Sequence, residues 1–170
     1  YASYGAGSAG HIASELILGR AGVEMVHVPY KGSGPAIVDV MGNQVSMMLA
    51  TVTASAGVAK EGKVRAIAVT SGKRLAALPP VPTVAESGMP DYELVEWEAI
   101  QAPAGTPKDV VDTLNKALRD VVASPEVRAK MANLGIEADG SKSPAEVATF
   151  VHSQRDKFAR IVQARAIKLQ

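Results

Sequence analysis

The first seventy residues alternate short apolar runs with helix-like segments, and this alternation limits the possible folds more than any other feature of the chain. Apolar runs suited to strands occupy residues 1–4, 25–28, 45–50 and 64–69. Helical patterns lie between them at residues 8–18, 33–41 and 53–59. Strands that alternate with helices favour a parallel sheet covered by helices. We therefore expect an α/β fold with a βαβ first half.

The second half has a different pattern, with one extended segment at residues 93–101 followed by three helix starts. Each start is a Ser or Thr with Pro directly after it, at Thr106, Ser124 and Ser143, which is the order of a cap and a first helical residue. Glu146 completes a capping box with Ser143. One strand cannot build a sheet, so we expect its partner strands to lie elsewhere and the chain to divide near residues 92–97.

Charge and composition exclude several classes of function. A net charge of +1, without any run of Lys or Arg, argues against nucleic acid as a partner. There are no cysteines, which removes thiolate metal ligands. The three histidines are far apart in sequence and lack metal-ligand spacing, so we expect no metal. The residue types therefore favour a small-molecule ligand.

The loop at residues 5–10, GAGSAG, lies between a predicted strand and a predicted helix and matches G-x-G-x-x-G. The acidic residue that a dinucleotide site requires after the second strand is missing, because Pro29 and Tyr30 stand there, so we expect no cofactor. The N–H groups of Ser8, Ala9 and Gly10 are expected to be free at a positive helix end, which suits a carboxylate.

A second turn with the same character follows the second strand. It carries Tyr30, Ser33 and Gly34, and Thr51 follows the third strand. The carboxyl ends of parallel strands share one edge of a sheet, where ligands gather. We therefore expect these turns to form adjoining walls of one anion site. His11 has two interpretations: it contacts the anion, or it packs in the first turn of its helix.

An enzyme is the competing hypothesis, because Ser8 lies in A-x-S-x-G, a relaxed nucleophile motif. The order Ser, acid, His leaves only His152 as the base, and His152 lies in a predicted amphipathic helix. No HGGG-type oxyanion loop accompanies Ser8. We therefore expect a binding protein and not a serine hydrolase.

Several motifs in order resemble one family along nearly the whole chain: YGAGSAGH at residues 4–11, VPYKGSGPA at 28–36, KVRAIAVTS at 63–71, VPTVAESG at 81–88 and APAGTP at 102–107. The chain is similar to the receptors of tripartite tricarboxylate transporters, also called the Bordetella uptake gene family. The resemblance implies a two-lobed periplasmic binding protein that closes on small carboxylates and passes them to membrane transporter subunits.

By position, the resemblance implies that residues 1–95 form lobe two. Residues 96–170 then complete lobe one, whose N-terminal part is absent from this chain. An alternative is a fragment that binds no ligand. Such a fragment would pair with a second copy through the unpaired strand at residues 93–101, giving a homodimer.

Overall fold

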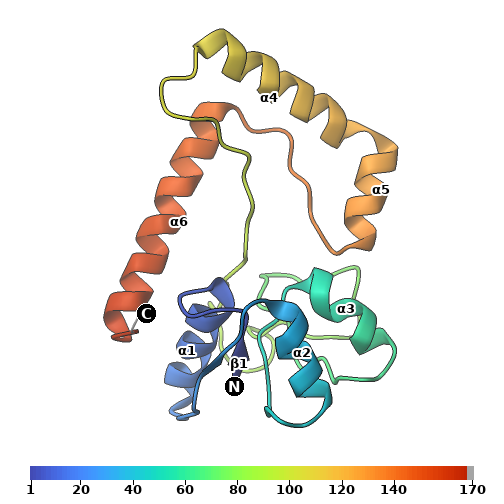
Figure 1. The fold of residues 1–170 in the computed structure, drawn as a ribbon, viewed down its shortest axis with the longest axis vertical. Helices are drawn as coiled ribbons and strands as arrows, with labels where there is room; N and C mark the ends of the chain where they lie inside the picture. Colours follow the sequence, from blue (N-terminus) through green and yellow to red (C-terminus); the bar gives the residue numbers. More distant parts are fainter. Residues whose placement is uncertain (168–170) are drawn as a thin grey trace.

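The structure is a computed structural model that describes residues 1–167. Figure 1 shows a lower part that contains the N-terminus and an upper part built from helices. The elements in chain order are β1 (Ala2–Ser3), α1 (Ala9–Ala21), β2 (Val28–Pro29), α2 (Ser33–Met41), α3 (Val52–Lys60), α4 (Lys108–Ala123), α5 (Pro125–Asn133) and α6 (Pro144–Ala164). Within the described part, no helix is both long and apolar enough to cross a membrane.

The parallel sheet is built around β1. Ala2 pairs with Val28 and Ser3 with Pro29 in a parallel register, and Ala2 forms a further parallel bridge to Met48 on its other side. The second strand was expected at residues 25–28 and is observed as β2 at Val28–Pro29, so it begins later and includes Pro29. The ladder to β2 runs through the N–H groups of Val28 and Tyr30, so Pro29 loses no bond by lacking a donor.

The third and fourth predicted strands and the predicted strand at 93–101 are not formed as strands in the described residues. Residues 45–50 form one parallel bridge, between Met48 and Ala2, and residues 64–69 form one, between Val69 and Thr83. Residues 93–101 form a single backbone bond of this kind, from the Leu94 N–H to the Thr70 carbonyl at 3.0 Å. A strand is defined by continuous pairing with a neighbour. The apolar patterns at 45–50 and 64–69 therefore predicted strands that form no ladder beyond these single bridges.

The main apolar cluster lies where α1 meets the segment around Tyr92. Ala13, Val84, Tyr92 and Leu94 are buried together, and Phe158 of α6 packs against them. The Tyr92 hydroxyl donates to the Ala13 carbonyl at 3.2 Å, so the largest buried side chain also has its polar atom satisfied. This contact joins the start of the second half of the chain to α1.

The upper part consists of α4, α5 and the beginning of α6, and α6 then descends to end beside α1 (Figure 1). None of the three helices has a buried residue in this structure. Val110, Leu114 and Val121 of α4 are all exposed, although α4 is amphipathic. A helix with an apolar stripe normally buries it against another element.

The helix starts in the second half follow the capping rules with one shift. Ser124 caps α5, and Ser143 with Glu146 forms the predicted capping box of α6. Thr106 does not cap α4, as the sequence had suggested, because Pro107 occupies that position and the Thr106 hydroxyl donates to the Pro103 carbonyl at 2.8 Å. The boundary moves by one residue, within the usual uncertainty of helix ends.

Replacing Ser143 by Ala is expected to lower the free energy of unfolding by about 1 kcal/mol, because the side-chain oxygen that accepts the Glu146 N–H is lost. Chemical denaturation of the complete gene product that contains this chain measures the change. Ser153→Ala is the matched control, since Ser153 lies inside the same helix, where Ala is the better helix former. An equal loss in both variants would contradict the capping role of Ser143.

Candidate functional site

Three helix N-termini follow the sheet in the way the sequence predicts. α1 begins after β1, α2 begins after β2, and α3 begins after the bridge at Met48. Because these three segments run parallel, with β1 in the middle, their carboxyl ends lie at one edge of the sheet. Figure 1 shows α1, α2 and α3 grouped around β1 in the lower part of the molecule.

The loop before α1 is held by side chains on both sides of it. The Gly7 N–H donates to His11 Nδ1 at 3.0 Å, and the Gly10 N–H donates to the Tyr4 hydroxyl at 2.9 Å. Ser8 caps the helix by accepting from the His11 N–H at 3.3 Å. Gly7 has a φ of 74°, a conformation that side chains other than glycine rarely adopt. The loop thus has one defined shape.

This shape leaves fewer free donors than the sequence suggested. The Ser8 N–H is bonded to the Gly5 carbonyl at 3.2 Å, and the Gly10 N–H is bonded to Tyr4. Within residues 1–167, only Ala9 of the three predicted N–H donors has no partner. The Ser8 hydroxyl accepts a bond but keeps its own proton for donation. Ala9 and Ser8 are therefore the donors that the end of α1 offers.

The start of α2 is more open. Gly32 stands at the cap position with a φ of 114° and supplies no side chain, and α2 has no side-chain cap. In the described structure neither the N–H of Ser33 nor that of Gly34 has a hydrogen-bond partner, and the Ser33 hydroxyl has none either. Two N–H groups and one hydroxyl are thus available at this positive helix end.

Tyr30 and Thr51 lie at the predicted turns but use their polar groups internally. The Tyr30 hydroxyl donates to Asp39 Oδ2 at 2.6 Å, which raises the pKa of Tyr30. The Thr51 hydroxyl caps α3 by accepting from the Ala54 N–H at 3.4 Å and lies 3.0 Å from the Thr53 hydroxyl. These two residues therefore shape the walls of the site rather than supply its free donors.

His11 is buried, with 5% of its surface exposed. Its ring stacks on His27 with a centroid separation of 3.9 Å and an interplanar angle of 13°. Burial lowers the pKa of His11, and the nearby Glu15 carboxylate opposes that shift. Burial is also the main cause of the lowered pKa of His27, reinforced by His11. Both rings are therefore neutral at pH 7, and His11 packs in the first turn of α1.

Sequence reasoning missed two residues that shape the loop, Ser3 and Tyr4. Tyr4 accepts from Gly10, and the Ser3 hydroxyl donates to the Gly5 carbonyl at 2.9 Å. Burial raises the pKa of Tyr4 to about 12, with the Glu96 carboxylate adding to the shift. The sequence offered one indication of their role, which is that Ser3 and Tyr4 come immediately before Gly5, the first glycine of the loop. The bonds by which they hold the loop go to backbone groups, which leave no trace in a residue pattern.

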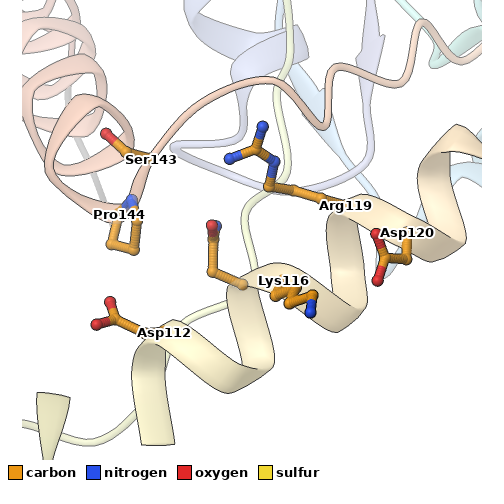
Figure 2. A pocket seen from close by; sticks show the side chains of 7 residues that line it. Asp112, Lys116, Arg119, Asp120, Ser143 and Pro144 are labelled. Carbon is orange, nitrogen blue, oxygen red and sulfur yellow. The ribbon is translucent and has the colours of Figure 1, made fainter. Parts of the chain in front are cut away.

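A groove in the upper part lies apart from the three helix ends. Figure 2 shows Asp112, Lys116, Arg119 and Asp120 along α4, with Ser143 and Pro144 at the start of α6 also lining the groove. Its two acidic and two basic side chains cancel in charge, so it offers an anion no net attraction. None of the residues predicted for the site lines it.

Ser8 lacks the surroundings of a nucleophile. Its hydroxyl oxygen accepts from the His11 N–H, which is a helix cap, and the His11 ring is committed to Gly7. The histidine considered as the base, His152, lies on an exposed stretch of α6. Among residues 1–167, no group of three His, Asp or Glu side chains gathers to hold a metal ion.

This architecture is that of an α/β protein in which three helix N-termini follow parallel segments of chain. Residues 1–167 match the family described as tripartite tricarboxylate transporter family receptor. The chain therefore belongs to this family of transporter receptors, which is not a family of enzymes. The resemblance seen in the sequence motifs is thereby confirmed.

Individual relatives agree with the family. The chain is 39% identical over 163 residues to the UPF0065 protein of the tcbD-tcbE intergenic region of a Pseudomonas species, covering 95% of this chain and 48% of that protein. The solved structure of R. palustris Rpa4515 with adipate is 33% identical, with a TM-score of 0.89, over 97% of this chain and 56% of that one. The periplasmic binding protein BugD is 34% identical, with a TM-score of 0.89, over 99% and 57%.

These coverages define what part of a receptor the chain represents. It spans about half the length of the Pseudomonas relative and slightly more than half of both solved chains. The fold is thus α/β and corresponds to part of a periplasmic binding protein.

Proposed function

We propose that this chain is the ligand-contacting part of a periplasmic receptor that binds small dicarboxylates for a tripartite transporter. The observation that carries the proposal is the pair of helix ends with unused donors, Ala9 on α1 and Ser33 with Gly34 on α2. A carboxylate is satisfied by N–H and O–H groups at a positive helix end. The relative Rpa4515 was solved with adipate, which supports a dicarboxylate as the ligand class.

The proposed site divides its residues into two roles. Ser8, Ala9, Ser33 and Gly34 donate to the ligand. The remaining predicted residues give the site its shape: Gly10, His11, Tyr30 and Thr51. Neutral donors carry the binding, so a strongly basic protein is not required, which agrees with a net charge of +1.

The domain division is part of the same proposal. Residues 1–95 form one lobe, and residues 96–170 complete a second lobe together with a segment outside this chain. The exposed apolar side chains of α4, Val110, Leu114 and Val121, support this division, because a covering segment would bury them. In such a protein the two lobes close around the carboxylate, and the receptor delivers it to the membrane subunits of the transporter.

Self-association is the second candidate, favoured by one observation. Residues 93–101 have no sheet ladder in the described structure, and Val95 and Ile100 are 44% and 76% exposed. An apolar segment without a sheet ladder of its own can pair with a second copy. Light scattering that shows a dimer, lost on replacing Ile100 by Lys, would favour this function over ligand capture.

Calorimetric titration of adipate and malate into the complete gene product tests the receptor proposal. Saturable binding of at least one diacid is expected, with no binding of dimethyl adipate, which has the same carbon chain without the charges. Binding of the diester as tightly as the diacid would show that the site does not recognise carboxylates. Absence of binding by every diacid would refute the proposed function.

A further inference from the structure

A stack of three rings, with Tyr1 and His11 buried and His27 half-buried, joins the elements that meet beside the 5–10 loop. The His11 and His27 rings lie 3.9 Å apart, and His27 lies 4.9 Å from the Tyr1 ring at an angle of 20°. Tyr1 precedes β1, His27 precedes β2, and His11 lies in the first turn of α1. The stack therefore connects both strands and the first helix at the base of the loop.

Each histidine is also tied to the loop by a hydrogen bond. His11 Nδ1 accepts from the Gly7 N–H at 3.0 Å, so this nitrogen carries no proton. His27 Nε2 lies 2.7 Å from the Ser3 hydroxyl oxygen, whose own proton is directed to the Gly5 carbonyl. The Ser3 hydroxyl thus links the His27 ring to Gly5. Ser3 also accepts from the Gly5 N–H at 3.3 Å.

These bonds control where the donors of α1 point. Gly5 and Gly7 have positive φ values of 154° and 74°, and glycine has the widest conformational freedom of any residue. The loop therefore takes one shape only because external groups hold it. Ser8 and Ala9, the proposed ligand donors, directly follow Gly7, so a shift at Gly7 moves them.

We propose that His11 and His27 are positioning residues of the carboxylate site, with neutral His11 holding the Gly7 N–H and His27 holding Gly5 through Ser3. This inference rests on the proposed function for its effect on affinity. The buried His11 ring acts through the backbone and not by touching the ligand, since only 5% of its surface is exposed.

The neutral state of His11 is supported by its surroundings. Burial lowers the pKa of His11 and of His27, and a second positive charge 3.9 Å away would oppose protonation of both rings. The titratable groups around the pair are Glu15 on α1 and Tyr1, whose hydroxyl donates to the Glu15 carboxylate at 2.6 Å. Glu15 favours protonation, and burial opposes it as the largest effect.

Two variants of His11 separate the hydrogen bond from the packing. His11→Phe keeps a ring against His27 and removes the acceptor, and His11→Asn places an amide oxygen where Nδ1 lies. Calorimetry of the complete gene product with adipate is expected to show about tenfold weaker binding for His11→Phe, because the Gly7 N–H loses its buried partner. His11→Asn is expected to restore the wild-type affinity to within about threefold, since it restores the acceptor.

Equal affinities of wild type and His11→Phe, or an Asn variant as weak as the Phe variant, would overturn the positioning role. A second measurement needs neither a variant nor a ligand: the Gly7 amide resonance of the wild type is followed by NMR from pH 8 to pH 5. We expect it to shift with the same midpoint as the His11 ring signal, and an amide insensitive to that titration would also overturn the inference. If the wild type binds no diacid, the proposed function fails, and the Gly7 titration still decides the positioning role.

Discussion

Replacing Ala9 and Ser33 together by Pro is expected to weaken dicarboxylate binding about a hundredfold while the protein stays folded. Each substitution removes one N–H from a helix end, and Ser33→Pro also removes the Ser33 hydroxyl. A hydrogen bond to a charged group contributes roughly 1.5–3 kcal/mol, or about tenfold or more per site. Ala9 and Ser33 are the first residues of α1 and α2, the helical position where Pro is best tolerated. Calorimetry with adipate on the complete gene product measures the loss.

The matched control retains every backbone donor. Ala9→Gly combined with Ser33→Thr alters the same positions and keeps both N–H groups and the hydroxyl, so its affinity is expected to stay close to that of the wild type. Circular dichroism establishes that the proline variant is folded. An unchanged affinity in the folded proline variant would remove Ala9 and Ser33 from the site.

Replacing Gly10 by Ala is expected to destabilise the protein by about 1–3 kcal/mol, the usual cost of forcing extra atoms into a packed region. A β-carbon on Gly10 would lie 2.6 Å from Tyr4 Cε1 and 2.7 Å from the Leu49 carbonyl oxygen. Tyr4 is bonded to the Gly10 N–H, and the Leu49 oxygen belongs to the backbone. Neither neighbour moves without breaking a contact of the loop, so thermal or chemical denaturation should report a clear loss.

Gly57 is the control position within the same molecule. It also lies inside a helix, α3, and a β-carbon there meets nothing within 4 Å. Gly57→Ala is therefore expected to stabilise the protein by about 0.5–1 kcal/mol, because Ala loses less backbone freedom on folding. If Gly10→Ala and Gly57→Ala had the same effect, the close approach of α1 to the chain at Leu49 would be refuted.

Helices were predictable from the sequence because their signals are local. The starts of α5 and α6 follow from Ser124, Ser143 and the Pro after each, and the box partner Glu146 lies three residues from its Ser. A cap joins a side chain to N–H groups within the same turn, so no other part of the chain is needed to define it. The wrong prediction that Thr106 caps α4 is also a local error, because the observed cap residue, Pro107, is the next residue in the chain.

Strands were predicted less well, and the reason is physical. An apolar run such as residues 64–69 favours extended chain, but a ladder also needs a neighbour at about 4.7–4.9 Å along its length. Within the described residues, the segment beside residues 64–69 pairs with them only through the bridge between Val69 and Thr83. Pairing is a property of two segments distant in sequence, and no single run contains it.

The sequence by itself determined where the helix N-termini of the proposed site lie, at the turns that carry Ser8 and Ser33. Gly, Ser and Pro between a strand and a helix favour a helix start. Only the tertiary structure decided which groups there are free. The Gly10 N–H is occupied by Tyr4 and the Gly7 N–H by His11, whereas the Ser33 and Gly34 N–H groups have no partner among residues 1–167. Hydrogen bonds to the backbone depend on distance and direction in the folded chain, and a residue pattern records neither.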